Sequence, residues 1–120
     1  MSKQLVPSEI IEGRILLVRG QKVLLDKDLA ELYGVETFNL NKAVRRNADR
    51  FPRDFMFQLT PAEFKNLKFH FGISGWGGTR NLPLAFSEQG VAMLPVPANM
   101  FVLTAGVRDR MSKGLTPNNA

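Results

Sequence analysis

The chain has no cysteine and a single histidine, His70. Without cysteine it can form no disulfide, thiolate metal site or thiol nucleophile, and one histidine cannot build an all-histidine metal site. No apolar run approaches the roughly 18 to 20 residues of a membrane span, and residues 1–12 lack the segments of a secretory signal. These absences favour a cytoplasmic protein that is not an enzyme and needs no metal or cofactor, and they argue against a membrane partner.

Both ends of the chain carry almost no net charge, and the excess of positive charge lies in its middle. The net charge is +5 over 120 residues. Residues 37–81 hold eight Lys or Arg against three Asp or Glu, whereas residues 1–36 hold five against six and residues 82–120 hold three against two. Such a basic stretch is commonly a solvated face, and it is also the electrostatic signature of a nucleic-acid-binding protein.

The first half of the chain predicts a β-hairpin followed by two short helices. Residues 14–25 contain two apolar runs separated by a turn at Gly20. Asp26 is placed to cap a helix over 27–33, which Gly34 would end in the left-handed conformation. Thr37 is placed to cap a second helix to about Asn47, whose inward positions follow the 3, 4, 7 spacing of Leu40, Ala43, Val44 and Asn47.

The second half alternates short strands with short helices. Residues 54–59 and 82–86 predict strands, and Thr60-Pro61-Ala62-Glu63 is a capping box that opens a helix to about Lys68. Ser87 is placed to cap a helix to about Leu94, and the glycine-rich stretch 72–78 predicts a wing-like loop. From Pro95 onward we expect a weakly ordered tail. The fold expected is a small single α+β domain over residues 14–94, between an N-terminal extension (1–13) and the tail (95–120).

The two helices near the middle have the spacing of a DNA-binding helix-turn-helix. Ala30 supplies a small side chain at the crossing, and Gly34, four residues later, supplies the tight turn. With Leu40 facing inward, turning about 100° per residue directs Lys42, Arg45 and Arg46 outward. Asn39 and Asn41 flank this basic face near the helix start, where Asn side chains can read adenine. An amphipathic helix whose basic face serves only solubility is the alternative interpretation.

The segments "DLAELYGV", "RFPRDFMFQLT" and "LPLAFSEQGVAML" together resemble the KilA-N type phage DNA-binding domain, in its open-reading-frame-six N-terminal branch. The resemblance covers about residues 14–94. It implies a compact α+β domain of phage or prophage regulators and antirepressors, and it makes "WGGTR" (76–80) a characteristic loop before a strand. Arg80 thereby becomes a second candidate DNA contact.

The sequence departs from this family's pattern at two places. Phe38 occupies an outward position where a polar or basic residue is expected, and we favour local packing over contact with a sugar or a thymine methyl group. Pro95 and Pro97 interrupt the helix that would continue after Leu94, which suggests the hypothesis of a truncated C-terminus.

These observations together predict non-catalytic binding to duplex DNA. The expected roles are principal contact by Lys42, Arg45 and Arg46, base reading by Asn39 and Asn41, and phosphate contact by Arg50, Arg53, Thr79 and Arg80. The alternatives are an antirepressor-like module that binds a repressor or another protein, and an RNA or single-strand binder. The cognate site and the oligomeric state are left open.

Overall fold

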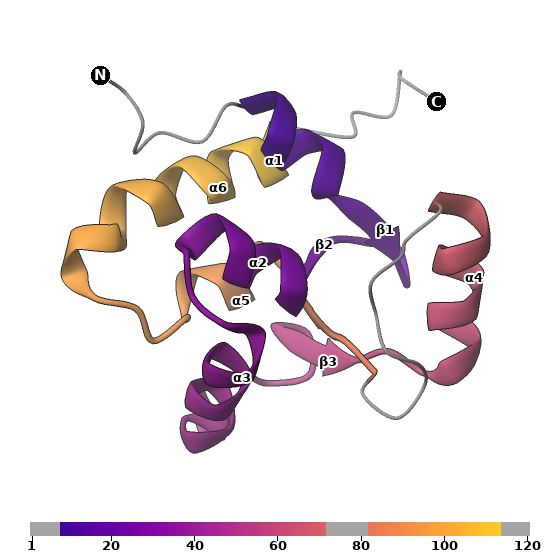
Figure 1. Ribbon diagram of the computed structural model, residues 1–120, viewed down its shortest axis with the longest axis horizontal. Coiled ribbons are helices and arrows are strands. Elements are labelled where there is room, and N and C mark those ends of the chain that lie inside the picture. The colour runs from indigo at the N-terminus through magenta and orange to yellow at the C-terminus, as the bar shows by residue number, and fades with distance from the viewer. Residues whose placement is uncertain (1–7, 72–81, 114–120) are drawn as a thin grey trace.

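The computed structural model describes residues 8–71 and 82–113 and shows a small, compact α+β fold (Figure 1). Its strands are β1 (Leu16–Val18), β2 (Gln21–Leu25), β3 (Met56–Gln58) and β4 (Leu84–Phe86). Its α-helices are α1 (Ser8–Arg14), α2 (Asp26–Tyr33), α3 (Thr37–Arg46), α4 (Pro61–Phe71), α5 (Glu88–Ala92) and α6 (Phe101–Lys113), and two 3₁₀ turns are η1 (Ala48–Arg50) and η3 (Ala98–Met100). The fold class therefore agrees with the sequence-based prediction. None of the helices described is long and apolar enough to cross a membrane.

The four strands form one antiparallel sheet in the order β1-β2-β4-β3. The predicted hairpin is confirmed, and its loop consists of Arg19 and Gly20, with φ values of 55° and 76°. Two consecutive positive φ angles are the signature of the type I′ turn, which matches the twist of the flanking strands. The Arg19 side chain forms an ion pair with Glu63 at 2.7 Å and lies over the Phe57 ring, 4.0 Å from the ring centroid.

The sheet buries both faces, and each face has its own hydrophobic cluster. Alternate residues of a strand point to opposite faces, so Leu24 joins one cluster while Val23 and Leu25 join the other. Helix α4 covers the second face through Phe64 and Leu67. Helices α1, α2, α3, α5 and α6 contribute to the cluster on the first face. The sheet therefore lies between a single helix and a layer of several helices.

Local capping signals give most of the helix boundaries. Gly34 ends α2 with φ 71°, and the Ser87 hydroxyl accepts a hydrogen bond from the N–H of Gly90 at the start of α5. The capping box is also present, because Thr60 and Glu63 each accept a hydrogen bond from the other's backbone N–H, at 3.1 and 2.9 Å. Asp26 and Thr37 differ from expectation. Both are the first residues of their helices rather than N-caps.

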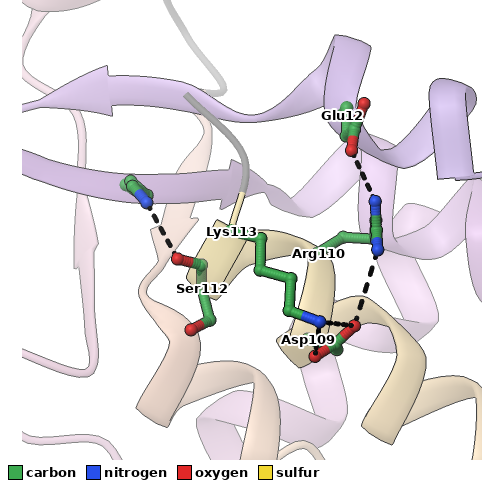
Figure 2. Close-up of polar contacts among 6 residues, drawn as sticks. Glu12, Asp109, Arg110, Ser112 and Lys113 are labelled. Carbon is green, nitrogen blue, oxygen red and sulfur yellow. Dashed lines mark hydrogen bonds and ion pairs between the residues drawn. The ribbon is translucent and has the colours of Figure 1, made fainter. Parts of the chain in front are cut away.

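The C-terminal part of the described chain corrects the expectation of a weakly ordered tail. After Pro97, η3 leads directly into the 13-residue helix α6, which buries Thr104, Val107 and Met111. Figure 2 shows how α6 is tied to the N-terminal region, where Arg110 donates a hydrogen bond to Glu12 at 2.7 Å. The Lys22 ammonium of β2 donates to the backbone carbonyl of Ser112 at 3.2 Å. Residues 8–13 and 95–113 therefore belong to the packed structure.

Candidate nucleic-acid interface

Helices α2 and α3 pack against each other around a short turn at residues 34–36. The N–H of Val35 donates to the carbonyl of Ala30 at 2.9 Å, and the N–H of Gly34 donates to the carbonyl of Glu31 at 3.2 Å. The turn therefore supplies hydrogen-bond donors to carbonyl groups in the last turn of α2. On α3, Leu40 and Val44 are 4% and 0% exposed and join the core. The structure thus brings the two helices together as the spacing predicted, with one face of α3 left outside.

The outer face of α3 carries the exposed side chains Phe38, Asn39, Lys42, Arg45 and Arg46. Figure 1 shows α3 projecting from the lower edge of the molecule, on the side opposite α1 and α6. Immediately after it, Arg50 at the end of η1 and Arg53 beyond Pro52 are also exposed. Five of the cations predicted as contacts are therefore accessible on α3 and the segment that follows it.

These five cations have no carboxylate partner, unlike the arginines elsewhere in the described part of the chain. Among residues 8–71 and 82–113, no Asp or Glu oxygen lies within 4.0 Å of the charged nitrogens of Lys42, Arg45, Arg46, Arg50 or Arg53. By contrast, acidic side chains pair with Arg14, Arg19, Arg108, Arg110 and Lys113. The basic face consists of Lys42, Arg45, Arg46, Arg50 and Arg53; none of these cations forms an ion pair with a described acid, and Arg45 interacts with the buried Asp26 carboxylate only at longer range.

Asn41 lies elsewhere than expected. Its side-chain amide donates a hydrogen bond to Asp26 at 2.9 Å, and its carbonyl oxygen is buried without a hydrogen-bond partner in the described part of the chain. At about 100° from Leu40 on the helical wheel, the residue lies beside the core rather than opposite it. We therefore revise the expectation for Asn41, because its side chain holds α3 in place instead of facing outward.

Asp26, which the sequence predicted only as a helix cap, positions the helix that carries the basic face. Its carboxylate is 2% exposed and accepts hydrogen bonds from the backbone N–H groups of Lys27 at 2.7 Å and Leu84 at 3.2 Å, in addition to the Asn41 amide. Burial raises the pKa of Asp26 above its usual value, while these donors and the charge of Arg45 act in the opposite direction. The same side chain therefore joins α2, α3 and β4. Its position directly after the buried run 23–25 is the sequence signal that could have revealed it.

Phe38 also departs from the favoured expectation of local packing. Its side chain is 71% exposed, and its ring lies 5.7 Å from the Lys42 ammonium.

Thr79, Arg80 and the glycine-rich stretch 72–78 lie outside the described residues, so the wing-like loop stays a prediction. Lys65 is an exposed lysine on α4, on a different side of the molecule from α3 (Figure 1).

The described residues present no group of three or more His, Asp or Glu side chains that could hold a metal ion. Two cavities among the described residues lie away from the basic face. One, of about 270 Å³, lies between β2, α5 and α6, and the other, of about 460 Å³, lies between α1, α2 and α6. The geometry of the basic face suits an extended anionic ligand at the surface rather than an enclosed small molecule.

Comparison with known proteins gives one result. A family model described as the ORF6N domain matches residues 13–95. The chain belongs to the ORF6N family. This family is a phage-associated, KilA-N-like domain and points to a phage-type regulatory domain. Neither the search of curated proteins nor the search of solved structures returned a match. The matched region includes the whole of α2, α3 and the basic face.

Proposed function

We propose that this ORF6N chain is the non-catalytic, duplex-DNA-binding domain of a phage- or prophage-type regulator acting in the cytoplasm, related to the KilA-N type. Its α2 and α3 would form the DNA-binding helix-turn-helix. The observation that carries the proposal is the basic face, whose five cations have no carboxylate partner in the described chain while most other arginines are paired. Unpaired, exposed cations on α3 and the segment that follows it are available to an external polyanion.

The dimensions of α3 support the same proposal. A helix of ten residues is about 15 Å long. The major groove of B-DNA is about 12 Å wide and admits an α-helix. With Leu40 and Val44 anchored in the core, the ridge of Phe38, Lys42 and Arg45 would face the groove. Lys42 and Arg45 would reach the phosphates at the groove edge with their charged ends, and Arg46, Arg50 and Arg53 would follow the adjacent phosphates.

The expected contributions differ among these residues. Lys42, Arg45 and Arg46 supply the principal contacts, and Asn39 is the remaining candidate base reader, since its exposed amide can bond adenine bidentately. Arg50 and Arg53 contact phosphates and add affinity without sequence information. Thr79 and Arg80 keep their predicted phosphate contacts.

The test is a titration of fluorescently labelled random duplex DNA with the full chain, at salt concentrations from about 50 to 200 mM. Counterion release predicts that the logarithm of affinity falls linearly with the logarithm of salt, with a slope of about −0.9 per phosphate contacted. Three to five contacts therefore give slopes between about −2.7 and about −4.5. Absence of binding at the lowest salt, or a flat titration, would overturn the proposal. Stronger competition by single-stranded DNA or RNA than by duplex would also overturn it.

A protein-interaction module of the antirepressor kind is the second candidate function, and a different surface favours it. Phe101 and Val102 at the start of α6 are 74% and 70% exposed, and Val102 lines the cavity of about 460 Å³ between α1, α2 and α6. Exposed apolar side chains beside an apolar cavity are typical of protein contacts. A flat salt titration with duplex would favour this candidate over the first.

A further inference from the structure

The phenyl ring of Phe38 is an apolar group placed within a cationic surface. It is the second residue of α3 and is 71% exposed, whereas the other large apolar residues of that helix, Leu40 and Val44, are buried. Because those two residues fix the inward face, the helical period turns Phe38 away from it, about 160° from Leu40 and about 120° from Val44. The core therefore neither requires nor uses this ring.

The ring also has little to hold it within the molecule. The Lys42 ammonium, one helical turn later, lies 5.7 Å from the ring centroid. In the described chain no other ring or cation contacts Phe38. Lys42 and Arg45 continue the same ridge at spacings of four and seven residues, so the ring stands at the N-terminal end of a row of outward side chains. This end of a recognition helix is the part that reaches base edges.

Base edges in the major groove offer few apolar groups to such a ring. Hydrogen-bond donors and acceptors occupy most positions, and the C5-methyl group of thymine is the apolar feature that distinguishes one base from another. The neighbouring residue Asn39 is exposed and has the amide that pairs with adenine. Adjacent side chains that suit thymine and adenine could read an A·T-containing step.

Resting on the proposed duplex binding, we infer that Phe38 is a specificity-determining residue that contacts the C5-methyl group of thymine in the major groove. The ring excludes water from the methyl group, and the Lys42 ammonium beside it binds a phosphate at the groove edge. Contact with a sugar would use the same ring but would be indifferent to the base. The methyl group therefore separates the two modes of contact.

The test compares duplexes that differ only in that methyl group. Duplexes are first selected from a random pool by the wild-type chain, and the selected site is then made with thymine or with deoxyuridine at every T position. The wild-type chain is expected to lose about fourfold in affinity for each contacted methyl group removed, from the transfer free energy of one buried carbon. Phe38→Ala is expected to bind both duplexes equally, and Phe38→Leu to recover part of the discrimination.

Two controls distinguish the possible failures. Asn39→Ala should keep the dependence on the methyl group, and unchanged thermal unfolding should show that Phe38→Ala is folded, as expected for an exposed side chain. A selected site without thymine, equal binding of both duplexes by the wild type, or the same loss in wild type and Phe38→Ala would overturn this inference. In each of these outcomes salt-dependent duplex binding would persist, whereas failure of the proposed function would abolish it.

Discussion

The side-chain amide of Asn41 donates a hydrogen bond to the buried carboxylate of Asp26 at 2.9 Å, which ties the helix bearing the basic face to the start of the preceding helix. The same carboxylate oxygen accepts the N–H of Leu84 in β4 at 3.2 Å. One acidic side chain therefore fixes α3 relative to both α2 and the sheet. In the proposed function this connection sets the angle at which the basic face meets DNA.

Removal of Asp26 should destabilise the fold. Asp26→Ala leaves the buried N–H of Leu84 and the amide of Asn41 without their acceptor, and each buried donor left unsatisfied costs about 1–3 kcal/mol. Chemical denaturation should show this loss in the free energy of unfolding. Asp49→Ala, at an exposed acid of η1, is the control and should change stability by less than about 0.5 kcal/mol. Equal stability of the two variants would contradict the role given to Asp26.

Two lysines provide a matched test of where DNA binds. Lys42 on α3 and Lys65 on α4 are both exposed and have no carboxylate within 4.0 Å in the described chain. Each alanine substitution removes one positive charge. Lys42→Ala should reduce the magnitude of the salt slope for duplex binding by about 0.9, and Lys65→Ala should leave it unchanged. The reverse pattern would place the DNA on the α4 side.

The ion pair between Arg19 and Glu63 should make stability depend on acid pH. Hydrogen bonding to Arg19 lowers the pKa of Glu63 from 4.5 to about 2. A carboxyl with a lowered folded-state pKa stabilises the fold fully above its unfolded value, and that stabilisation is lost as pH falls from 4.5 toward 2.

Glu63→Gln isolates this contribution, because glutamine can still serve in the capping box but cannot ionise. The difference in unfolding free energy between wild type and Glu63→Gln should be largest above pH 4.5 and shrink toward pH 2. A difference that stays constant over this range would show that the ion pair does not perturb Glu63.

Gly90 is required by the close approach of α5 to the segment before β3. A Cβ at this position would overlap the carbonyl oxygen of Phe55, which already accepts the N–H of Ser87. Gly90→Ala should therefore destabilise by about 1–3 kcal/mol or more, read as a lower thermal midpoint. At Gly106 in α6 no described heavy atom lies within 4 Å of an added Cβ, so Gly106→Ala should be neutral or stabilise by up to about 1 kcal/mol. Equal midpoints would contradict this packing.

Local signals in the sequence were sufficient for much of the fold. The left-handed cap at Gly34, the capping box at Thr60 and the Ser87 cap are each formed by groups within a few residues of one another, so the residue types at those spacings reveal them. The alternation of apolar residues likewise gave the strands. The inward face of α3 followed from the spacing of Leu40 and Val44.

Contacts between distant residues could not be predicted in this way. The prolines at 95 and 97 do end local structure, but α6 begins at Phe101 and is held by contacts such as Arg110 with Glu12, 98 residues apart. Asn41 lies at the border between the buried and exposed faces of α3, and its hydrogen bond to Asp26, 15 residues away, directs its side chain toward the core. Local packing was predicted for Phe38 because the residues around it in the sequence do not reveal whether the core has room for its ring.

The most direct test of the central claim is the salt dependence of duplex binding by the triple variant Lys42→Ala, Arg45→Ala and Arg46→Ala. If all three side chains contact phosphates, the magnitude of the slope should fall by about 2.7, with affinity lowered at every salt concentration. A variant with alanine at Arg108, Arg110 and Lys113 removes the same charge from α6, where each cation has a carboxylate partner, and should keep the wild-type slope. A folded triple variant of α3 that binds duplex with wild-type affinity and slope would contradict the account.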